Sequence, residues 1–124
     1  MTFVDKISDA EWEVLEVLWK HNNSTASDVF NYLDSQRGWK KNTVKTLLSR
    51  LVEKEILTYK QEGRSYIYSV RYSKEECRQM KNKVFLDKFY KGGVKDLFAS
   101  FLKTEEISKS DLEDLKKMLD NMDK

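Results

Sequence analysis

Residues 41–70 read KNTVKTLLSRLVEKEILTYKQEGRSYIYSV, and the pattern of apolar side chains changes halfway along this stretch. In its first half, apolar side chains recur at positions i, i+3, i+4 and i+7. These side chains are Val44, Leu47, Leu48 and Leu51. This spacing predicts an amphipathic helix over residues 41–54 with one buried face. The opposite face is polar or basic and has no acidic residue before Glu53.

A hairpin is expected directly after this helix. From Ile56 the residues are mostly β-branched or aromatic, and a segment with a turn glycine at 61–64 separates the runs 56–60 and 65–70. Two such runs around a glycine predict a β-hairpin. Because an isolated hairpin is only marginally stable in water, we expect this one to pack against the helices.

Two further helices are expected before this stretch, each opened by a capping signal. The S-x-x-E pattern at residues 8–11 is a capping box and predicts a helix over 9–20. The weaker T-x-x-D pattern at 25–28 predicts a helix over 26–36. The order helix, helix, helix, hairpin is typical of a winged helix-turn-helix domain, which we place at residues 1–72.

Residues 73–124 carry more large apolar side chains than so short a segment can bury by itself. Capping and glycine signals predict helices over 74–91 and 94–103, and a last helix from Ser108. We expect the interface between two copies to contain Phe85, Phe89, Tyr90, Leu97, Phe98, Phe101, Leu112, Leu115 and Leu119. The sequence therefore predicts a mostly α chain whose three C-terminal helices form a homodimer.

Positive charge is concentrated in the middle of the chain. Residues 36–74 hold ten Lys or Arg and three Asp or Glu, a net charge of +7. A basic segment of this kind is typical of a surface that binds a polyanion, and the second helix of a helix-turn-helix enters the major groove of DNA. The predicted contacts to double-stranded DNA are Lys40, Lys41, Asn42, Thr43, Lys45, Thr46, Ser49, Arg50 and, at the hairpin tip, Arg64.

The start of the 41–54 helix also favours an anionic partner. Lys40 and Lys41 occupy its cap and first-turn positions, where cations oppose the helix dipole. An anion bound there offsets this cost. Two alternatives stay open on the residues alone: a lysine-rich solvated surface, and a winged helix that serves as a protein-interaction scaffold.

Other classes of protein are not indicated. Cys77 and His21 are the single residues of their kinds, too few for a disulfide framework or a Cys/His metal site. Cys77 lies on an apolar helix face and is expected to be a small buried side chain. No phosphate-binding loop or catalytic motif appears, so neither an enzyme nor a cofactor is expected. No long apolar run or secretory leader appears, which favours a cytoplasmic protein without a membrane partner.

Four segments carry a likeness to a known family. They are ISDAEWEVLEVLW (7–19), NTVKTLLSRLVEKEIL (42–57), RSYIYSV (64–70) and FYKGGVKDLFASFL (89–102). They resemble the penicillinase-repressor family of BlaI, MecI and CopY. The resemblance implies a dimeric repressor that binds a dyad-symmetric operator upstream of resistance genes. It places Thr43, Lys45, Thr46 and Arg50 at recognition-helix positions.

The chain also departs from the family's pattern. Lys45 stands where arginine is common, and Glu55 stands where a helix-ending glycine is common. Lys40 and Lys41 replace a more usual capping serine and its neighbour. Because lysine is a point charge rather than a planar fork, bidentate reading of guanine at position 45 is expected to be weaker. These differences concern the operator sequence rather than the fold.

The resemblance further implies a route of induction. The β-lactam-responsive members are cut at an Asn-Phe bond in the dimerisation segment, and the matching bond here is Ser100–Phe101. Cleavage there by a sensor-linked protease is a hypothesis, since the Asn is not kept and Phe101 also fits as a core residue of its helix. The copper-responsive members carry C-terminal Cys-x-Cys motifs that this sequence lacks. A β-lactam-type regulon is favoured, with a copper- or small-molecule-responsive regulon as the alternative.

Overall fold

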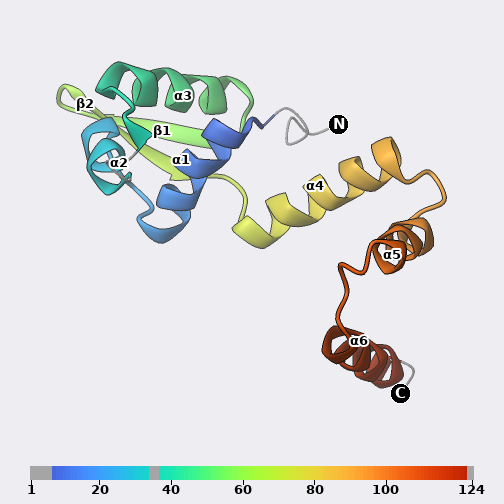
Figure 1. Cartoon of the computed structure of the whole chain (residues 1–124). Coiled ribbons are helices and arrows are strands. Elements are labelled where there is room, and N and C mark those ends of the chain that lie inside the picture. The colour runs from blue at the N-terminus through green and yellow to red at the C-terminus, as the bar shows by residue number, and fades with distance from the viewer. Residues whose placement is uncertain (1–6, 34–36, 123–124) are drawn as a thin grey trace. The chain divides into compact units, whose positions relative to one another are not determined.

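The computed structural model describes residues 7–33 and 37–122, and the chain divides into two compact units, residues 1–82 and 83–124 (Figure 1). The first unit contains α1 (Asp9–Lys20), α2 (Ala26–Tyr32), α3 (Lys41–Glu53), β1 (Leu57–Glu62), β2 (Ser65–Val70) and the start of α4 (Lys74–Phe89). The second contains the end of α4, α5 (Val94–Lys103) and α6 (Lys109–Met122). This order confirms the predicted, mostly helical chain with a winged helix-turn-helix.

The predicted capping signals are formed at the starts of α1 and α2. Ser8 N donates to Glu11 Oε1 at 2.8 Å, and Glu11 N donates to Ser8 Oγ at 3.1 Å. Thr25 and Asp28 make the same reciprocal pair, at 3.1 and 3.0 Å. Lys40, at the N-cap of α3, makes no side-chain capping hydrogen bond. The recognition helix of the motif therefore begins with open N–H groups, as its sequence predicts.

Two helices end earlier than the sequence pattern predicts. α2 stops at Tyr32, because the backbone of Leu33 is already extended with ψ at 147°. The rest of that prediction, residues 34–36, lies outside the described part of the chain. α4 stops at Phe89, two residues short of the predicted end, because a turn begins there that Gly93 completes with φ at 88°. A positive φ of this size suits glycine, and Gly93 is the N-cap of α5 rather than a C-cap of α4.

The core of the first unit lies between α1, α3 and the hairpin. Its buried side chains include Val14, Leu15, Leu18, Val29, Val44, Leu47, Leu48, Leu51, Ile56, Leu57, Tyr68 and Cys77. The apolar stripe predicted for α3 is thus confirmed as core. Cys77 is also fully buried, so the first two turns of α4 pack with the winged helix. The two compact units divide after Asn82, and the domain boundary expected after residue 72 stays a prediction.

A backbone bridge that the sequence does not predict attaches the hairpin to the turn between α1 and α2. β1 and β2 pair antiparallel, with Leu57 opposite Val70. Ser24 then pairs with Tyr68: Ser24 N donates to Tyr68 O at 3.2 Å, and Tyr68 N donates to Ser24 O at 2.8 Å. These two bonds give the hairpin the packing partner that an isolated pair of strands needs.

The second unit leaves its apolar side chains open in the single chain. None of its described side chains is buried, although α5 and α6 are both amphipathic. Phe89 is 60% exposed and Leu119 is 62% exposed. Within residues 7–33 and 37–122, no helix combines the length and the apolar character that crossing a membrane requires.

Candidate nucleic-acid interface

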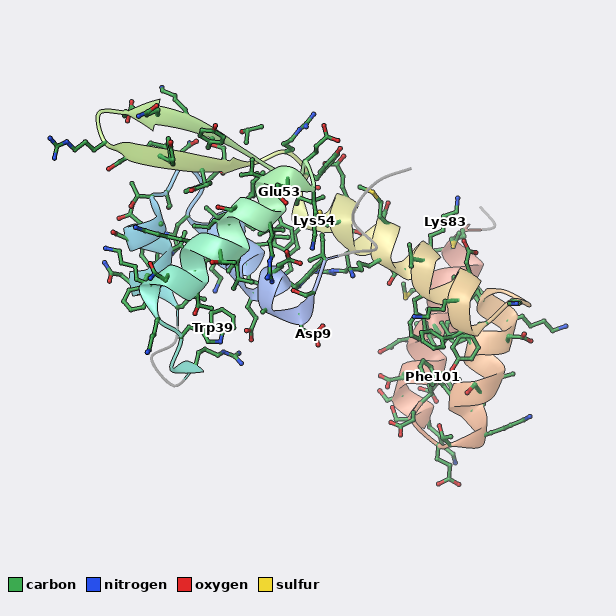
Figure 2. The ribbon with its side chains drawn as sticks, turned by 90° about the horizontal axis from the view of Figure 1, so that it is seen from above. Asp9, Trp39, Glu53, Lys54, Lys83 and Phe101 are labelled. Atoms are coloured by element: carbon green, nitrogen blue, oxygen red, sulfur yellow. The ribbon has the colours of Figure 1, made fainter. Side chains whose placement is uncertain are left out.

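The outer face of α3 is a continuous polar surface. Asn42, Lys45, Thr46, Ser49, Arg50 and Glu53 line a shallow depression along it. These side chains lie opposite the leucine stripe that α3 buries in the core. Figure 2 shows Glu53 and Lys54 at the C-terminal end of α3 and Trp39 before its start. About three helical turns are therefore presented to a partner without an apolar interruption.

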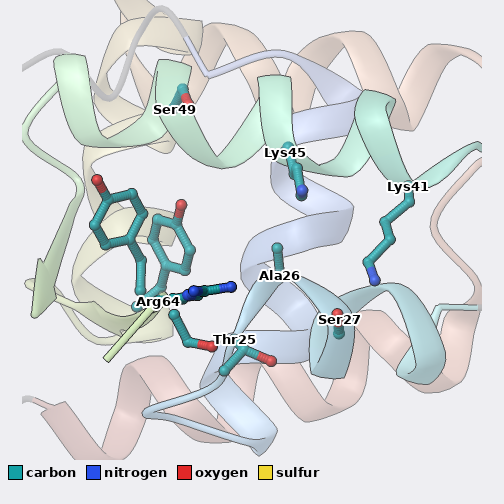
Figure 3. A pocket seen from close by; sticks show the side chains of 10 residues that line it. Thr25, Ala26, Ser27, Lys41, Lys45, Ser49 and Arg64 are labelled. Carbon is teal, nitrogen blue, oxygen red and sulfur yellow. The ribbon is translucent and has the colours of Figure 1, made fainter. Parts of the chain in front are cut away.

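A second hollow, of about 350 Å³, lies between the start of α2, the edge of the exposed face of α3 and the hairpin (Figure 3). Its lining consists of Thr25, Ala26, Ser27, Lys41, Lys45, Ser49, Arg64, Ser65, Tyr66 and Tyr68. In Figure 3, Lys41 and Lys45 extend from α3 toward α2, and Arg64 enters from the hairpin. Three cations and several hydroxyls thus face one hollow that no carboxylate lines. A concave surface of one sign of charge attracts anions.

The cations of this surface lack anionic partners. Among the described residues, no ion pair includes Lys40, Lys41, Lys45, Arg50 or Arg64. Several cations elsewhere in the same unit are paired with carboxylates. Lys54 Nζ, for example, lies 2.6 Å from Glu11 Oε1. The cations of α3, its N-cap and the hairpin tip are therefore available to phosphate groups.

Thr46 illustrates how the outer face of α3 suits a base edge. Its hydroxyl donates to Asn42 O at 3.0 Å, a bond within the helix. The hydroxyl proton is thus occupied, and the side chain presents its methyl group and a lone pair. These groups match a thymine methyl and a base amino group.

All nine residues predicted to contact DNA are exposed. The structure brings Lys41, Lys45, Ser49 and Arg64 together around the hollow and gathers most of the others on the outer face of α3. Lys40 and Thr43 line neither depression. The hydroxyls that complete the hollow were not predicted from the sequence; they belong to Thr25, Ser27, Ser65 and Tyr66.

Tyr66 is the missed residue that the sequence could have revealed. It is two residues from Tyr68 on the same strand, so both point to the same face. Tyr68 is nearly buried, and this burial raises the pKa of its hydroxyl. Tyr66 remains 46% exposed, with its ring 4.9 Å from that of Tyr59. Ser27 has no comparable signal, because its place in the hollow depends on how α2 meets α3.

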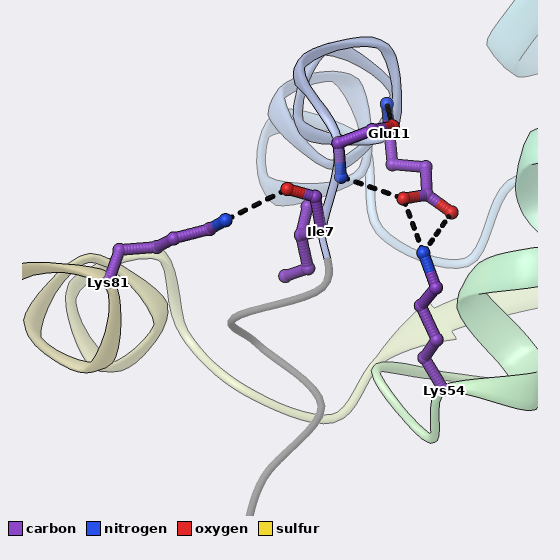
Figure 4. Close-up of polar contacts among 5 residues, drawn as sticks. Ile7, Glu11, Lys54 and Lys81 are labelled. Atoms are coloured by element: carbon purple, nitrogen blue, oxygen red, sulfur yellow. Dashed lines mark hydrogen bonds and ion pairs between the residues drawn. The ribbon is translucent and has the colours of Figure 1, made fainter. Parts of the chain in front are cut away.

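One buried carboxylate fixes the end of α3. Glu11 is 1% exposed, and its two oxygens accept hydrogen bonds from Lys54 Nζ at 2.6 and 2.8 Å (Figure 4). Burial by itself raises the pKa of Glu11, but the hydrogen bonds from Lys54 and Ser8 outweigh it, so the pKa is below its ordinary value. The carboxylate that caps α1 therefore also anchors the C-terminal end of α3.

The described residues provide neither a metal-binding cluster nor a reactive thiol. No group of three or more His, Cys, Asp or Glu side chains in the described residues is placed to hold a metal ion. Cys77 is fully buried, and its burial raises the pKa of the thiol. A raised thiol pKa and burial are typical of a structural cysteine.

The three helices, the hairpin and the exposed polar face of α3 define a winged helix-turn-helix protein of the DNA-binding class. The family model described as penicillinase repressor matches residues 7–121, nearly the whole chain. The chain belongs to this family, which consists of transcriptional repressors and not of enzymes.

Individual relatives agree with this assignment. The penicillinase repressor of Bacillus licheniformis is 31% identical over 120 residues, which cover 97% of this chain and 94% of that protein. The solution structure of the DNA-binding domain of the repressor BlaI has a TM-score of 0.54 and 34% identity, over 61% of this chain and 93% of that one. The Bacillus licheniformis BlaI monomer, solved with the blaP half-operator, has a TM-score of 0.51 and 34% identity over the same shares.

Proposed function

We propose that this repressor acts in the cytoplasm as a homodimer that binds a dyad-symmetric operator in double-stranded DNA, with one α3 in each half-site. The observation that carries the proposal is the set of unpaired cations on α3 and the hairpin tip, beside an outer helix face free of acidic side chains before Glu53. The related BlaI structure with a half-operator supports DNA as the ligand.

The two depressions suggest a division of labour on DNA. Asn42, Thr46 and Arg50 lie on the outer face of α3, where side chains of a recognition helix meet base edges. Lys41 and Arg64 line the hollow between α3 and the hairpin, where the sugar–phosphate backbone passes in the proposed complex. Lys45 and Ser49 line both depressions, so either contact is within their reach.

Dimerisation is proposed to cover the apolar faces of the second unit. Phe98, Leu102, Ile107, Leu112, Leu115 and Leu119 line an almost wholly apolar hollow of about 210 Å³ between α5 and α6. Phe85, Phe89 and Tyr90 form a ring cluster at the end of α4, with centroids 5.2 and 5.7 Å apart. Leu97 and Phe101 add to the apolar face of α5. Helices of this kind reach a stable core when a second copy supplies the opposite layer.

We further propose a β-lactam-type resistance operon as the target, with release by a sensor-linked protease at the Ser100–Phe101 bond. This bond lies inside α5, and Tyr90 Oη is 3.4 Å from Ser100 Oγ. A protease binds its substrate as an extended strand. Cutting there therefore requires α5 to unwind locally, and it would separate α6 from the rest of the chain.

To test this proposal, the full chain is used to select duplexes from a random DNA pool. The affinity of the chain for the enriched duplex and the number of chains bound per duplex are then measured. We expect an inverted repeat, two chains per duplex, and affinity that falls steeply with salt because phosphate contacts release counterions. A protein-interaction scaffold would enrich no sequence and show no salt-steep binding, which would overturn the proposal.

The cleavage proposal is tested separately. The chain is co-expressed with a candidate sensor-protease, a β-lactam is added, and fragments are sought by mass spectrometry. A cut after Ser100 is expected. An intact chain under inducing conditions would refute this route of release while leaving operator binding unaffected.

A further inference from the structure

α4 is held at two points in the winged unit, once to α1 and once to the residue that precedes its N-cap. Lys74 Nζ lies 2.9 Å from Glu16 Oε2, and this hydrogen bond lowers the pKa of Glu16. Two helical turns later, Lys81 Nζ donates to Ile7 O at 2.8 Å (Figure 4). Between the two lysines, Cys77 is fully buried in the core. None of these residues lines either of the two depressions proposed to meet DNA.

These contacts share one face of α4. Lys74, Cys77 and Lys81 follow the spacing i, i+3, i+7, which places them in one stripe along a helix. The two lysines are about 10 Å apart along the helix axis. Their partners are nine residues apart in the chain: Glu16 lies in the second half of α1, and Ile7 directly precedes its N-cap Ser8. Two attachments so far apart fix the direction of the first turns of α4, whereas a single attachment would leave the helix able to pivot.

The Lys81 contact also adjoins the carboxylate that anchors α3. Ile7 is followed by Ser8, whose N–H donates to Glu11, and Glu11 accepts from Lys54 at the end of α3. In Figure 4, Lys81 of α4 and Lys54 at the end of α3 approach this short segment from different elements. The start of α1 is therefore the common attachment of α3 and α4.

We propose that Lys74 and Lys81 are positioning residues that determine which spacing between two half-sites the repressor accepts. The inference rests on the proposed function, because it needs a dimer on a dyad-symmetric operator. α4 continues from the winged unit into the helices that pair two copies. When these contacts hold the start of α4 in one direction, the dimer fixes the separation of the two α3 helices. When the contacts are lost, each α3 can reach its half-site independently.

The contribution of these contacts to stability is expected to be small. The side chains of Lys74 and Glu16 are 42% and 37% exposed, and ion pairs at such positions contribute little to folding. Their effect is therefore best sought in the geometry of binding. Substitution by methionine keeps an unbranched, flexible side chain as far as Cε and removes the amino group with its charge and donors.

The experiment compares the full wild-type chain with the Lys74→Met, Lys81→Met double variant. The probes are the inverted repeat enriched by the wild-type chain, the same duplex with two base pairs inserted between its half-sites, and a duplex with one half-site. Insertion of two base pairs turns one half-site by roughly 70° about the helix axis. Lys83→Met is the matched control, since Lys83 is exposed on the same helix and none of the contacts found in the described part of the chain includes it.

Wild type and Lys83→Met are expected to lose about 10-fold or more in affinity on the lengthened duplex, because one half-site is forfeited. The double variant is expected to lose less than about 3-fold, with unchanged affinity for the single half-site. Arginine keeps a donor at position 81. Using Lys81→Arg in place of Lys81→Met in the double variant should therefore restore part of the loss of affinity on the lengthened duplex. If the double variant does not fold, Lys81→Met alone provides the test.

Two results would contradict the inference, and they are distinguishable. A double variant with the full wild-type penalty would show that these lysines do not determine spacing, while operator binding stands. A wild-type chain that binds the single half-site as tightly as the inverted repeat would overturn the proposed function and this inference with it.

Discussion

The two units of this chain use the same kinds of side chain in opposite ways. In the winged unit Leu15 and Leu48 are completely buried, whereas in the second unit Phe89 and Leu119 are 60% and 62% exposed. Amphipathic helices occur in both. The difference is that α1, α3 and the hairpin enclose a common core, while α5 and α6 have no opposite layer in the single chain. An apolar stripe on a helix therefore becomes part of a core within one chain only when the same chain supplies the facing element.

The largest effect is expected from breaking the enclosed core. Leu48→Ala should lower the free energy of unfolding by about 2–5 kcal/mol, because it leaves a cavity in a fully buried site. Urea denaturation at two protein concentrations measures this loss, which should not depend on concentration. Leu119→Ala is the matched substitution in the second unit. It should weaken association of two copies, and an equal, concentration-independent loss for both variants would contradict the comparison.

Glu11→Ala tests the polar attachment within the winged unit. It removes the buried carboxylate that Lys54 contacts and, with it, the half of the capping box in which Ser8 N donates to Glu11 Oε1. The expected loss is about 3 kcal/mol, near the lower end for breaking a buried ion pair because Lys54 is partly exposed. Glu13→Ala on the same helix, which removes a partly exposed pair with Arg37, should change stability by less than about 0.5 kcal/mol. Similar losses for the two variants would contradict the role given to Glu11.

The same carboxylate predicts how stability depends on pH. Because the pKa of Glu11 is lower in the folded chain, its stabilising contribution is complete above the ordinary value near 4.5 and is lost as the pH falls through the folded pKa. Urea midpoints measured from neutral pH to below that value should fall in the wild type. They should fall less steeply in Glu11→Gln, and parallel curves would count against the prediction. Glu16, whose pKa is also lowered, accounts for part of the remaining slope.

Lys45→Ala separates binding from folding in the winged unit. It should leave the urea midpoint unchanged and reduce DNA affinity by about 1–3 kcal/mol if Lys45 contacts a base, with relaxed preference at one position. Uniform weakening on every sequence would assign Lys45 to a phosphate. Lys60→Ala is the control on the hairpin. Lys60 lines neither depression, and its Nζ pairs with Glu62 Oε1 at 3.6 Å. Equal weakening by both variants would contradict the assigned interface.

The smallest effect is expected where α3 passes into the hairpin. Glu55 has φ at 64°, a left-handed conformation that costs a non-glycine residue about 1 kcal/mol. Glu55→Gly should therefore stabilise the winged unit by about that amount in thermal or urea denaturation. Glu53→Gly, inside α3, should destabilise it by a similar amount. Loss of stability in Glu55→Gly would show that the Glu55 side chain makes a contact that outweighs the strain.

Local sequence patterns were sufficient to predict most elements of the fold. The leucine stripe of α3 and the capping box at Ser8 and Glu11 depend on residues a few positions apart, which a sequence displays directly. The contact of Glu11 with Lys54 joins residues 43 positions apart, and no periodicity reports it. The bridge between Ser24 and Tyr68 escaped prediction for the same reason.

The candidate site was predictable to a similar degree. The side chains of α3 that face outward follow from the position of its buried stripe. The hollow between α2, α3 and the hairpin does not, because Ser27, Lys41 and Arg64 meet only through the packing of three elements. The division of the chain after Asn82 also depends on packing, since it follows from the burial of Cys77 against the winged core.

Whether α3 lies against DNA is tested most directly by mapping amide chemical shifts of the isotope-labelled full chain with and without the enriched inverted-repeat duplex. Residues 40–50 and the hairpin tip at 63–66 should show the largest changes, while α6 should show little change at constant protein concentration. Changes that are absent from residues 40–50, or confined to the second unit, would contradict the claim that α3 lies against DNA.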